Sequence, residues 1–205
     1  MNNTSCTKRL LQSLNENSIC YCVLKADEQK QYVDLFVHLD DLAQFRKLLS
    51  NLAYTQTGST ADTYSFIYCL EADSFWENKQ GHRIHAACQM FCSSLSNLSK
   101  SKLPLDHAIQ QSLWQNKVWN EKEQSWEISR EDYFIYLLVD CVFNQHAFDE
   151  ASIYDISTLA ELLDSPTLVE KLKGVFFKYT TTLISLIKES RFSEVFQKYQ
   201  SFCDY

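Results

Sequence analysis

The sequence predicts an α+β fold, in which a mixed β-sheet with flanking helices is followed by a helical domain. Gly and Pro, at 3 and 2 of 205 residues, are too scarce for a β-sandwich or barrel with many tight turns. Short β-rich runs alternate with helical patterns in the first half, and helical periodicity dominates after Pro104. We therefore expect an α/β domain over residues 1–102 and a helical domain over 103–205.

The first half is expected to alternate between helices and strands. An amphipathic helix comes first, with Leu10, Leu11 and Leu14 on one face. Two strands follow over residues 19–24 and 32–37. A helix is then expected over residues 39–52, and two further strands over 64–70 and 83–91. Polar composition predicts loops or linkers over residues 55–62, 73–81 and 93–102.

The second half is expected to be helical apart from one extended segment. A helix is predicted over residues 106–115. The extended segment, or short hairpin, is predicted over residues 119–128. Ser129 and Asp132 have the spacing of a capping box and open a helix with one apolar stripe. Pro166 suits a helix start. Further helices are predicted over residues 156–163, 168–187 and 192–205.

Charge and motif content exclude several function classes. The net charge is −7 and the basic residues are dispersed, so no basic patch predicts a nucleic-acid partner. The glycine-rich signatures of dinucleotide sites, P-loops and serine hydrolases are absent, and we expect no organic cofactor. The longest apolar stretch, residues 133–139, is too short to span a bilayer.

The eight cysteines predict buried apolar side chains in a reducing compartment. No CxxC pair occurs. The only cluster with metal-like spacing is Cys88 and Cys92 with His82 and His85, and it lacks a second pair. The polar first turn does not read as a signal peptide, so we expect a cytoplasmic protein.

Three motifs together resemble the nucleotidyltransferase superfamily. The run ICYCVLK over residues 19–25 precedes YVDLFV over 32–37, and a helix follows from Asp40. Residues 128–137 (ISREDYFIYL) are similar to the opening of the helical domain in that family. The resemblance covers most of the chain, although each motif is short. It is to the DNA polymerase β-like fold, and in particular to small bacterial members of uncharacterised or polysaccharide-associated role.

The resemblance also shows where the active-site pattern departs from the family. Family members carry two acids on one strand, as D-h-D with h apolar, and a third acid on a later strand. Aligned residue by residue, Asp34 falls on the second acid and Tyr32 on the first. Arg83, two residues before His85, stands at the third. Lys25 matches a lysine of the family.

The resemblance implies a protein that binds a ligand but has weakened or lost catalytic activity. The family's acids hold Mg²⁺ ions that position a nucleoside triphosphate. Asp34 would be the remaining metal ligand and catalytic residue, Lys25 and Arg83 would contact phosphate, and His85 would be a polar contact. We expect a diverged protein that binds a nucleotide or other anion in the interdomain cleft, with nucleotidyl transfer weakened or lost. Whether it is an enzyme is left open.

Each candidate also has a plain structural interpretation. Asp34 could face solvent beside a turn, Lys25 could be solvated at a strand end, and His85 could be an ordinary core or surface histidine. Substitute carboxylates could come from elsewhere, and the candidates are Asp27, Glu28, Glu71 and Asp73. The alternative function is a protein–protein interaction module or homo-oligomer that uses the aromatic helices near the carboxyl terminus.

Overall fold

The computed structural model describes residues 5–59, 73–93 and 102–203. The chain forms two compact units, each built from two segments. Residues 1–90 and 111–129 make up unit 1, and residues 91–110 and 130–205 make up unit 2. Helix α4 (His107–Gln115) runs across the division. The other helices and strands each belong to one unit.

Unit 1 is a mixed sheet with two helices. Within the described residues the sheet has seven strands in the order β3-β4-β5-β2-β1-β9-β8. Strands β1 and β2 are antiparallel, whereas β2 pairs in parallel with β5 and β1 in parallel with β9. The bounds are α1 (Cys6–Glu16), β1 (Tyr21–Asp27), β2 (Tyr32–Val37), η1 (Leu39–Asp41), α2 (Leu42–Asn51), β3 (Tyr54–Ser59), β4 (Ser74–Asn78), β5 (Arg83–Ala87), β8 (Val118–Asn120) and β9 (Ser125–Glu127).

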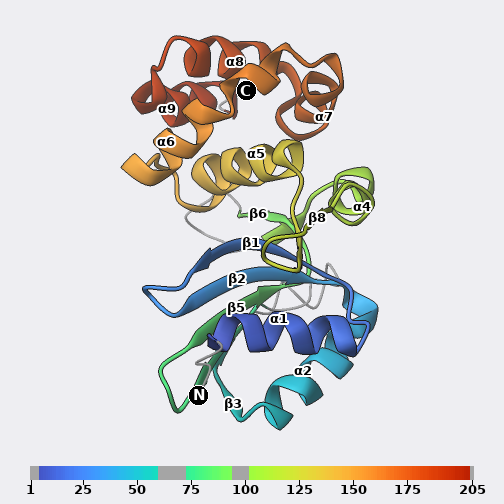
Figure 1. The fold of residues 1–205 in the computed structure, drawn as a ribbon. Coiled ribbons are helices and arrows are strands. Elements are labelled where there is room, and N and C mark those ends of the chain that lie inside the picture. Colours follow the sequence, from blue (N-terminus) through green and yellow to red (C-terminus); the bar gives the residue numbers. More distant parts are fainter. Residues whose placement is uncertain (1–4, 60–72, 94–101, 204–205) are drawn as a thin grey trace. The chain divides into compact units, whose positions relative to one another are not determined.

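Helices α1 and α2 cover one face of this sheet (Figure 1). Ser5 caps α1 by accepting a hydrogen bond from the backbone N–H of Lys8, which satisfies one of the free donors at the helix start. The leucines of α1 and α2 pack with alternate residues of β1, β2, β4 and β5 in a single apolar cluster. The core of unit 1 therefore lies between the helices and one side of the sheet, as the predicted stripe in residues 10–14 requires.

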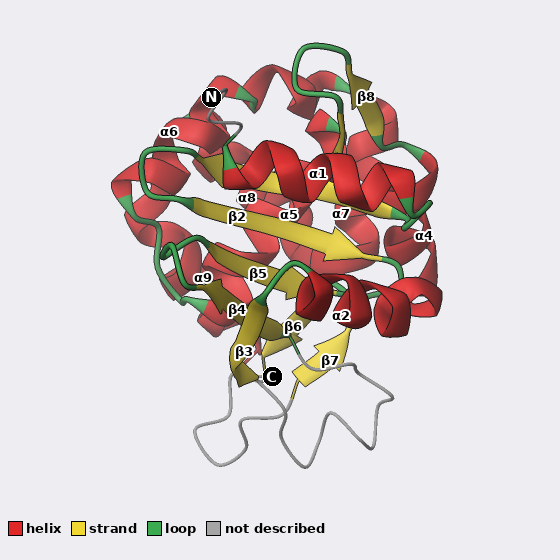
Figure 2. Ribbon diagram, turned by 60° about the horizontal axis from the view of Figure 1, so that its bottom comes forward, coloured by secondary structure: helices red, strands yellow, loops and turns green. Residues whose placement is uncertain are grey.

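Two strands occur where the sequence predicts loops. Strand β3 covers most of the predicted loop at 55–62, and β4 lies in the predicted connection at 73–81. Both predictions were wrong, because β3 carries few buried side chains and β4 has only five residues. The strand predicted over residues 64–70 lies outside the described residues. The mixed sheet itself is confirmed (Figure 2).

Over its described residues, unit 2 is helical except for one small strand pair. Its helices and turns are α5 (Arg130–Val139), η2 (Asp140–Asn144), α6 (Glu150–Thr158), η3 (Ala160–Asp164), α7 (Pro166–Phe176), η4 (Phe177–Tyr179), α8 (Thr180–Lys188) and α9 (Phe192–Cys203). Strands β6 (Phe91–Ser93) and β7 (Lys102–Pro104) pair antiparallel. Pro166 stands in the first turn of α7, where its missing N–H costs no hydrogen bond, as the sequence predicts.

Aromatic side chains of unit 2 pack largely on one another. Phe143 stacks on Phe176 with ring centroids 5.2 Å apart, and Tyr199 meets the edges of Phe143 and Tyr179 at the same distance. The hydroxyl of the buried Tyr179 donates to the backbone carbonyl of Val195 over 2.6 Å. Phe143, Phe176 and Tyr179 are therefore part of the core of unit 2, together with buried aliphatic side chains such as Leu168 and Leu172. No helix among the described residues is both long enough and apolar enough to cross a bilayer.

Candidate functional site

Five side chains named from the sequence lie on one face of the sheet in unit 1. Lys25 of β1 pairs with Asp34 of β2, and Asp34 pairs with His85 of β5. Tyr32, two residues before Asp34 on β2, pairs with Arg83, two residues before His85 on β5. Paired residues point to the same side of a sheet, and so does every second residue of a strand. The five side chains therefore share the face opposite α1 and α2.

A β-bulge in β1 is what brings Lys25 to this face. Val23 pairs with Leu35 but Lys25 pairs with Asp34, so Leu24 is an extra residue in the ladder. Without the bulge, strict alternation would place Lys25 on the same side as Val23, against the helices. The irregularity moves the ammonium group from the core side to the side that carries Asp34.

His85 lies between two carboxylates. Its Nδ1 is 2.8 Å from Oδ1 of Asp34, and its Nε2 is 3.7 Å from Oδ2 of Asp73, the residue that precedes β4. All three side chains are largely buried, with exposed fractions of 18% for His85, 15% for Asp34 and 9% for Asp73. The ring of Phe75 stacks on the imidazole at 4.7 Å between centroids and 14° between planes. The imidazole is thus held on both nitrogens and on one ring face.

The two carboxylates make His85 a cation near neutral pH. Burial on its own lowers the pKa of an imidazole because it disfavours the charged form. The hydrogen bond to Asp34, the ion pair with Asp73 and the negative charges of both outweigh burial and raise the pKa of His85 from 6.5 to about 9. The arrangement is therefore a largely buried imidazolium whose single positive charge is shared by two carboxylates.

Tyr32 stands where the family has its first acid, and it stays neutral. Burial is the main cause that raises the pKa of its phenol, and the negative charge of Asp34 raises it further. The positive charge of Arg83 opposes this and is too weak to reverse it. Tyr32 therefore presents a protonated hydroxyl beside Asp34, and that hydroxyl supplies no negative charge to a metal ion.

Lys25 and Arg83 remain open to a ligand. Both residues are exposed. Within the part of the chain that the structure describes, neither side chain forms an ion pair. His85 offsets one of the two negative charges of Asp34 and Asp73, and Lys25 and Arg83 are the exposed cations of this face that an anion could contact directly.

The donor set does not fit a centre with two magnesium ions. Mg²⁺ requires oxygen ligands in near-octahedral geometry, usually including carboxylates. Of the three positions that carry acids in the family, only Asp34 is a carboxylate, and its Oδ1 is bound to His85. Among the described residues no group of three or more His, Cys, Asp or Glu side chains is placed to hold a metal ion. No catalytic step through such ions can be built from these residues.

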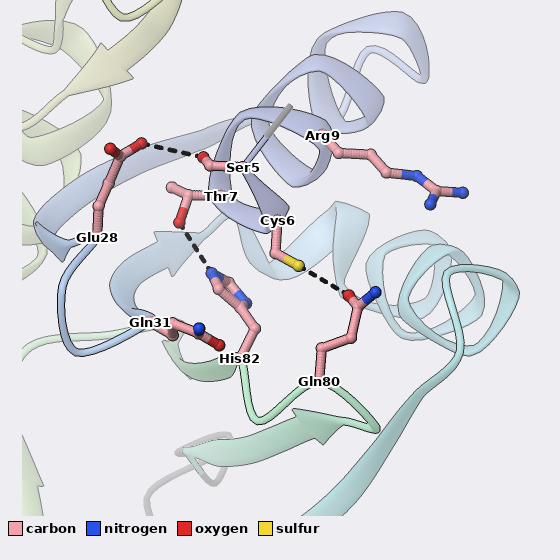
Figure 3. A pocket seen from close by; sticks show the side chains of 8 residues that line it. All are labelled: Ser5, Cys6, Thr7, Arg9, Glu28, Gln31, Gln80 and His82. Carbon is pink, nitrogen blue, oxygen red and sulfur yellow. Dashed lines mark hydrogen bonds between the residues drawn. The ribbon is translucent and has the colours of Figure 1, made fainter. Parts of the chain in front are cut away.

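A second histidine lies below a polar pocket on the covered side of the sheet. His82 is 1% exposed, and its Nε2 and Nδ1 are each 2.8 Å from a hydroxyl oxygen, of Thr7 and Tyr54 respectively. Burial lowers the pKa of His82, so the ring is neutral. The pocket, about 340 Å³, is lined by the start of α1 and the turns before β2 and β5 (Figure 3). With both nitrogens of His82 bonded to hydroxyls, the metal-like cluster suggested by residue spacing does not form around it.

The structure shows which of the candidate substitute carboxylates lies near His85. Asp73 approaches His85, whereas Asp27 accepts from the backbone of Lys30 and Glu28 accepts from Ser5. Glu71 lies outside the described residues. The stacking of Phe75 was missed, because its strand was predicted as a loop. Burial alternates along this strand in the structure, with Ser74 and Trp76 buried and Phe75 and Glu77 exposed, but the adjacent Phe75 and Trp76 break the apolar–polar alternation that would mark a strand in the sequence.

Comparison with known proteins supports the fold. No protein-family model matches the chain, and no curated protein matches it. The structure is similar to that of the lincosamide antibiotic adenylyltransferase LnuA bound to lincomycin, with 11% identity, a TM-score of 0.47, and coverage of 77% of this chain and 98% of that one. It is also similar to the antibiotic-resistance factor ANT(2'')-Ia, with 10% identity, a TM-score of 0.51, and coverage of 89% and 96%. The chain has the nucleotidyltransferase fold that the sequence resemblance predicted.

Proposed function

We propose that this chain is a diverged protein of the nucleotidyltransferase fold that binds a nucleotide or another anionic ligand, with nucleotidyl transfer weakened or lost. The ligand would bind on the sheet face that carries Lys25, Asp34, Arg83 and His85. One observation supports this above all, namely the imidazolium of His85 held between Asp34 and Asp73. A fixed organic cation stands where family members place carboxylates and their metal ions.

Binding of an anion is favoured by the charges left over on this face. Lys25 and Arg83 are exposed, and their strands lie on either side of β2. The guanidinium of Arg83 can donate two parallel hydrogen bonds to a phosphate, and the ammonium of Lys25 adds a second positive charge. The positive charge of His85 reduces the repulsion between the carboxylate of Asp34 and the ligand.

Loss of transfer chemistry follows from the same residues. Phosphoryl and nucleotidyl transfer depend on positioning and on stabilising the charge that develops on the phosphate, which metal ions usually provide. Tyr32 and Arg83 cannot replace two metal-binding carboxylates. His85 has no free nitrogen for activating an acceptor hydroxyl while both carboxylates hold it. We therefore expect binding without efficient turnover.

Thermal-shift titration with ATP, GTP, CTP and UTP, each with and without Mg²⁺, tests the proposal. At least one nucleotide should raise the melting temperature without Mg²⁺. The double variant K25A/R83A should abolish the rise, whereas Lys122→Ala, whose side chain is 89% exposed in the β8–β9 turn, should retain it. A parallel assay for pyrophosphate release should show little turnover.

Two results would contradict the proposal. A nucleotide-dependent shift that requires Mg²⁺ and disappears in Asp34→Ala, together with pyrophosphate release, would show a working metal-dependent enzyme. The absence of any shift with all four nucleotides and with inorganic phosphate or pyrophosphate would reject anion binding on this face.

A further inference from the structure

A second pocket in unit 1 lies at the start of β1, away from the end that carries Lys25. It measures about 690 Å³, which is within the usual range for small-molecule sites. The end of α1, the residues before β1 and the β8–β9 hairpin line it. The side chains that define its chemistry are Ile19, Cys20, Lys117, Trp119 and Trp126. None of these side chains takes part in the site proposed above.

Lys117 carries a positive charge into this pocket with only weak partners. Its Nζ is 3.1 Å from Sγ of Cys20 and 4.8 Å from the centre of the Trp126 ring. Sulfur is a poor acceptor, and a ring face attracts a cation only modestly. No carboxylate among the described residues pairs with Lys117. A ligand oxygen with negative charge would therefore be a much better partner than Cys20.

Two tryptophans provide flat apolar surface beside that charge. Trp119 and Trp126 meet edge to face, with ring centroids 5.2 Å apart and planes at 62°. Trp126 also packs against the core cluster of unit 1, which fixes its orientation. Trp119 is opposite Trp126 in the hairpin and is only partly buried. Ile19, which is 4% exposed, adds apolar surface to the lining.

We propose that this pocket binds a planar aromatic molecule that carries one negatively charged group, such as a carboxylate. The ring would contact Trp119 and Trp126, and the charged group would accept from the ammonium of Lys117 in place of Cys20. Stacking on indole and a charge-assisted hydrogen bond favour the same orientation of the ligand. The proposal is independent of nucleotide binding on the sheet face.

Calorimetric titration of the full chain with naphthalene-2-carboxylate and with the neutral naphthalene-2-methanol tests this. The carboxylate should bind about tenfold more tightly, the typical effect of one charge-assisted hydrogen bond. Lys117→Gln should remove that preference while leaving the neutral compound unaffected. Trp119→Ala should weaken both ligands about tenfold through loss of ring contact. Trp119→Phe, which keeps a ring, should weaken them less and serves if the alanine variant fails to fold.

The variant Lys122→Gln serves as a control, and alkylation of cysteine provides a second measurement of binding. Lys122 is on the same hairpin and exposed, so its replacement should change neither affinity. Saturating naphthalene-2-carboxylate should slow alkylation of Cys20 by iodoacetamide at least severalfold and leave Cys6, which lines the other pocket, unchanged. Equal binding of the two compounds, no binding heat with either, or a preference that survives Lys117→Gln would each overturn the proposal.

Discussion

Replacing His85 with glutamine should remove a pH-dependent contribution to the stability of unit 1. In the folded chain the pKa of His85 is raised from 6.5 to about 9 by Asp34 and Asp73, against the effect of burial. A group whose pKa is higher in the folded state binds protons more tightly there, so protonation favours folding. The contribution is fully present below about pH 6.5 and is lost as the pH rises through about 9.

The size of the effect follows from the shift. One pKa unit corresponds to about 1.4 kcal/mol, so the rise from 6.5 to about 9 corresponds to about 3 kcal/mol of unfolding free energy. Because the side chain of His85 is only 18% exposed, solvent screens this little. Glutamine keeps an amide that can donate to Asp34 but has no charge, so the variant should lack the pH dependence.

Urea unfolding followed by tryptophan fluorescence measures this directly. All four tryptophans, Trp76, Trp114, Trp119 and Trp126, belong to unit 1 together with His85. The difference in unfolding free energy between the wild type and His85→Gln should shrink by about 3 kcal/mol between pH 6 and pH 9.5. Histidine NMR provides a second measurement, because His85 should titrate near pH 9 while His82, whose pKa is lowered by burial, should titrate below 6.5.

Either of two results would refute the reasoning. A stability difference that stays constant across this range would mean that His85 has the same proton affinity in both states. An NMR titration of His85 at or below its ordinary value would mean that the two carboxylates do not hold the proton. His82 is the internal reference, since it is buried without a carboxylate partner and should shift in the opposite direction.

Three further outcomes are expected. Asp34→Asn keeps an oxygen that can accept from His85 but removes the negative charge, so the pKa of His85 in the NMR titration should fall toward its ordinary value. Tyr54→Phe leaves one nitrogen of the buried His82 without a partner, and should lower the unfolding free energy by about 1–3 kcal/mol in urea. Leu14→Ala, at a side chain that is 0% exposed, should cost about 2–5 kcal/mol in the same assay.

Much of the fold could be predicted from apolar periodicity in the sequence, because in these elements the apolar residues are the ones that are buried. Strand β2 has the bounds expected for residues 32–37, and α1 buries the three leucines that the helical stripe requires. Strand β3 was missed because it lies at the edge of the sheet with mostly exposed polar side chains, so no apolar alternation marks it. β4 was missed because its alternation spans five residues next to a polar turn.

The position of Lys25 illustrates what periodicity alone cannot predict. Counting alternate residues from the buried Tyr21 and Val23 would assign Lys25 to the helix-covered side of the sheet. Only the bulge at Leu24, visible in the pairing register, reverses that assignment. A bulge depends on how two strands pair, and neighbouring residues in the sequence do not specify it.

The pairing of His85 with Asp34 places a positive charge beside a carboxylate without a metal ion. Three carboxylates require positive charge to lie close together, and metal ions supply it in enzymes that use them. Here one acid position holds a neutral phenol, another holds Arg83, and the carboxylates of Asp34 and Asp73 share one imidazolium. A metal ion at Asp34 would lie close to the positive charge of the His85 imidazolium, which disfavours its binding while His85 is protonated. Part of the positive charge is therefore carried by the chain itself, and under the proposed function the two exposed cations beside it, Lys25 and Arg83, contact the anionic ligand directly.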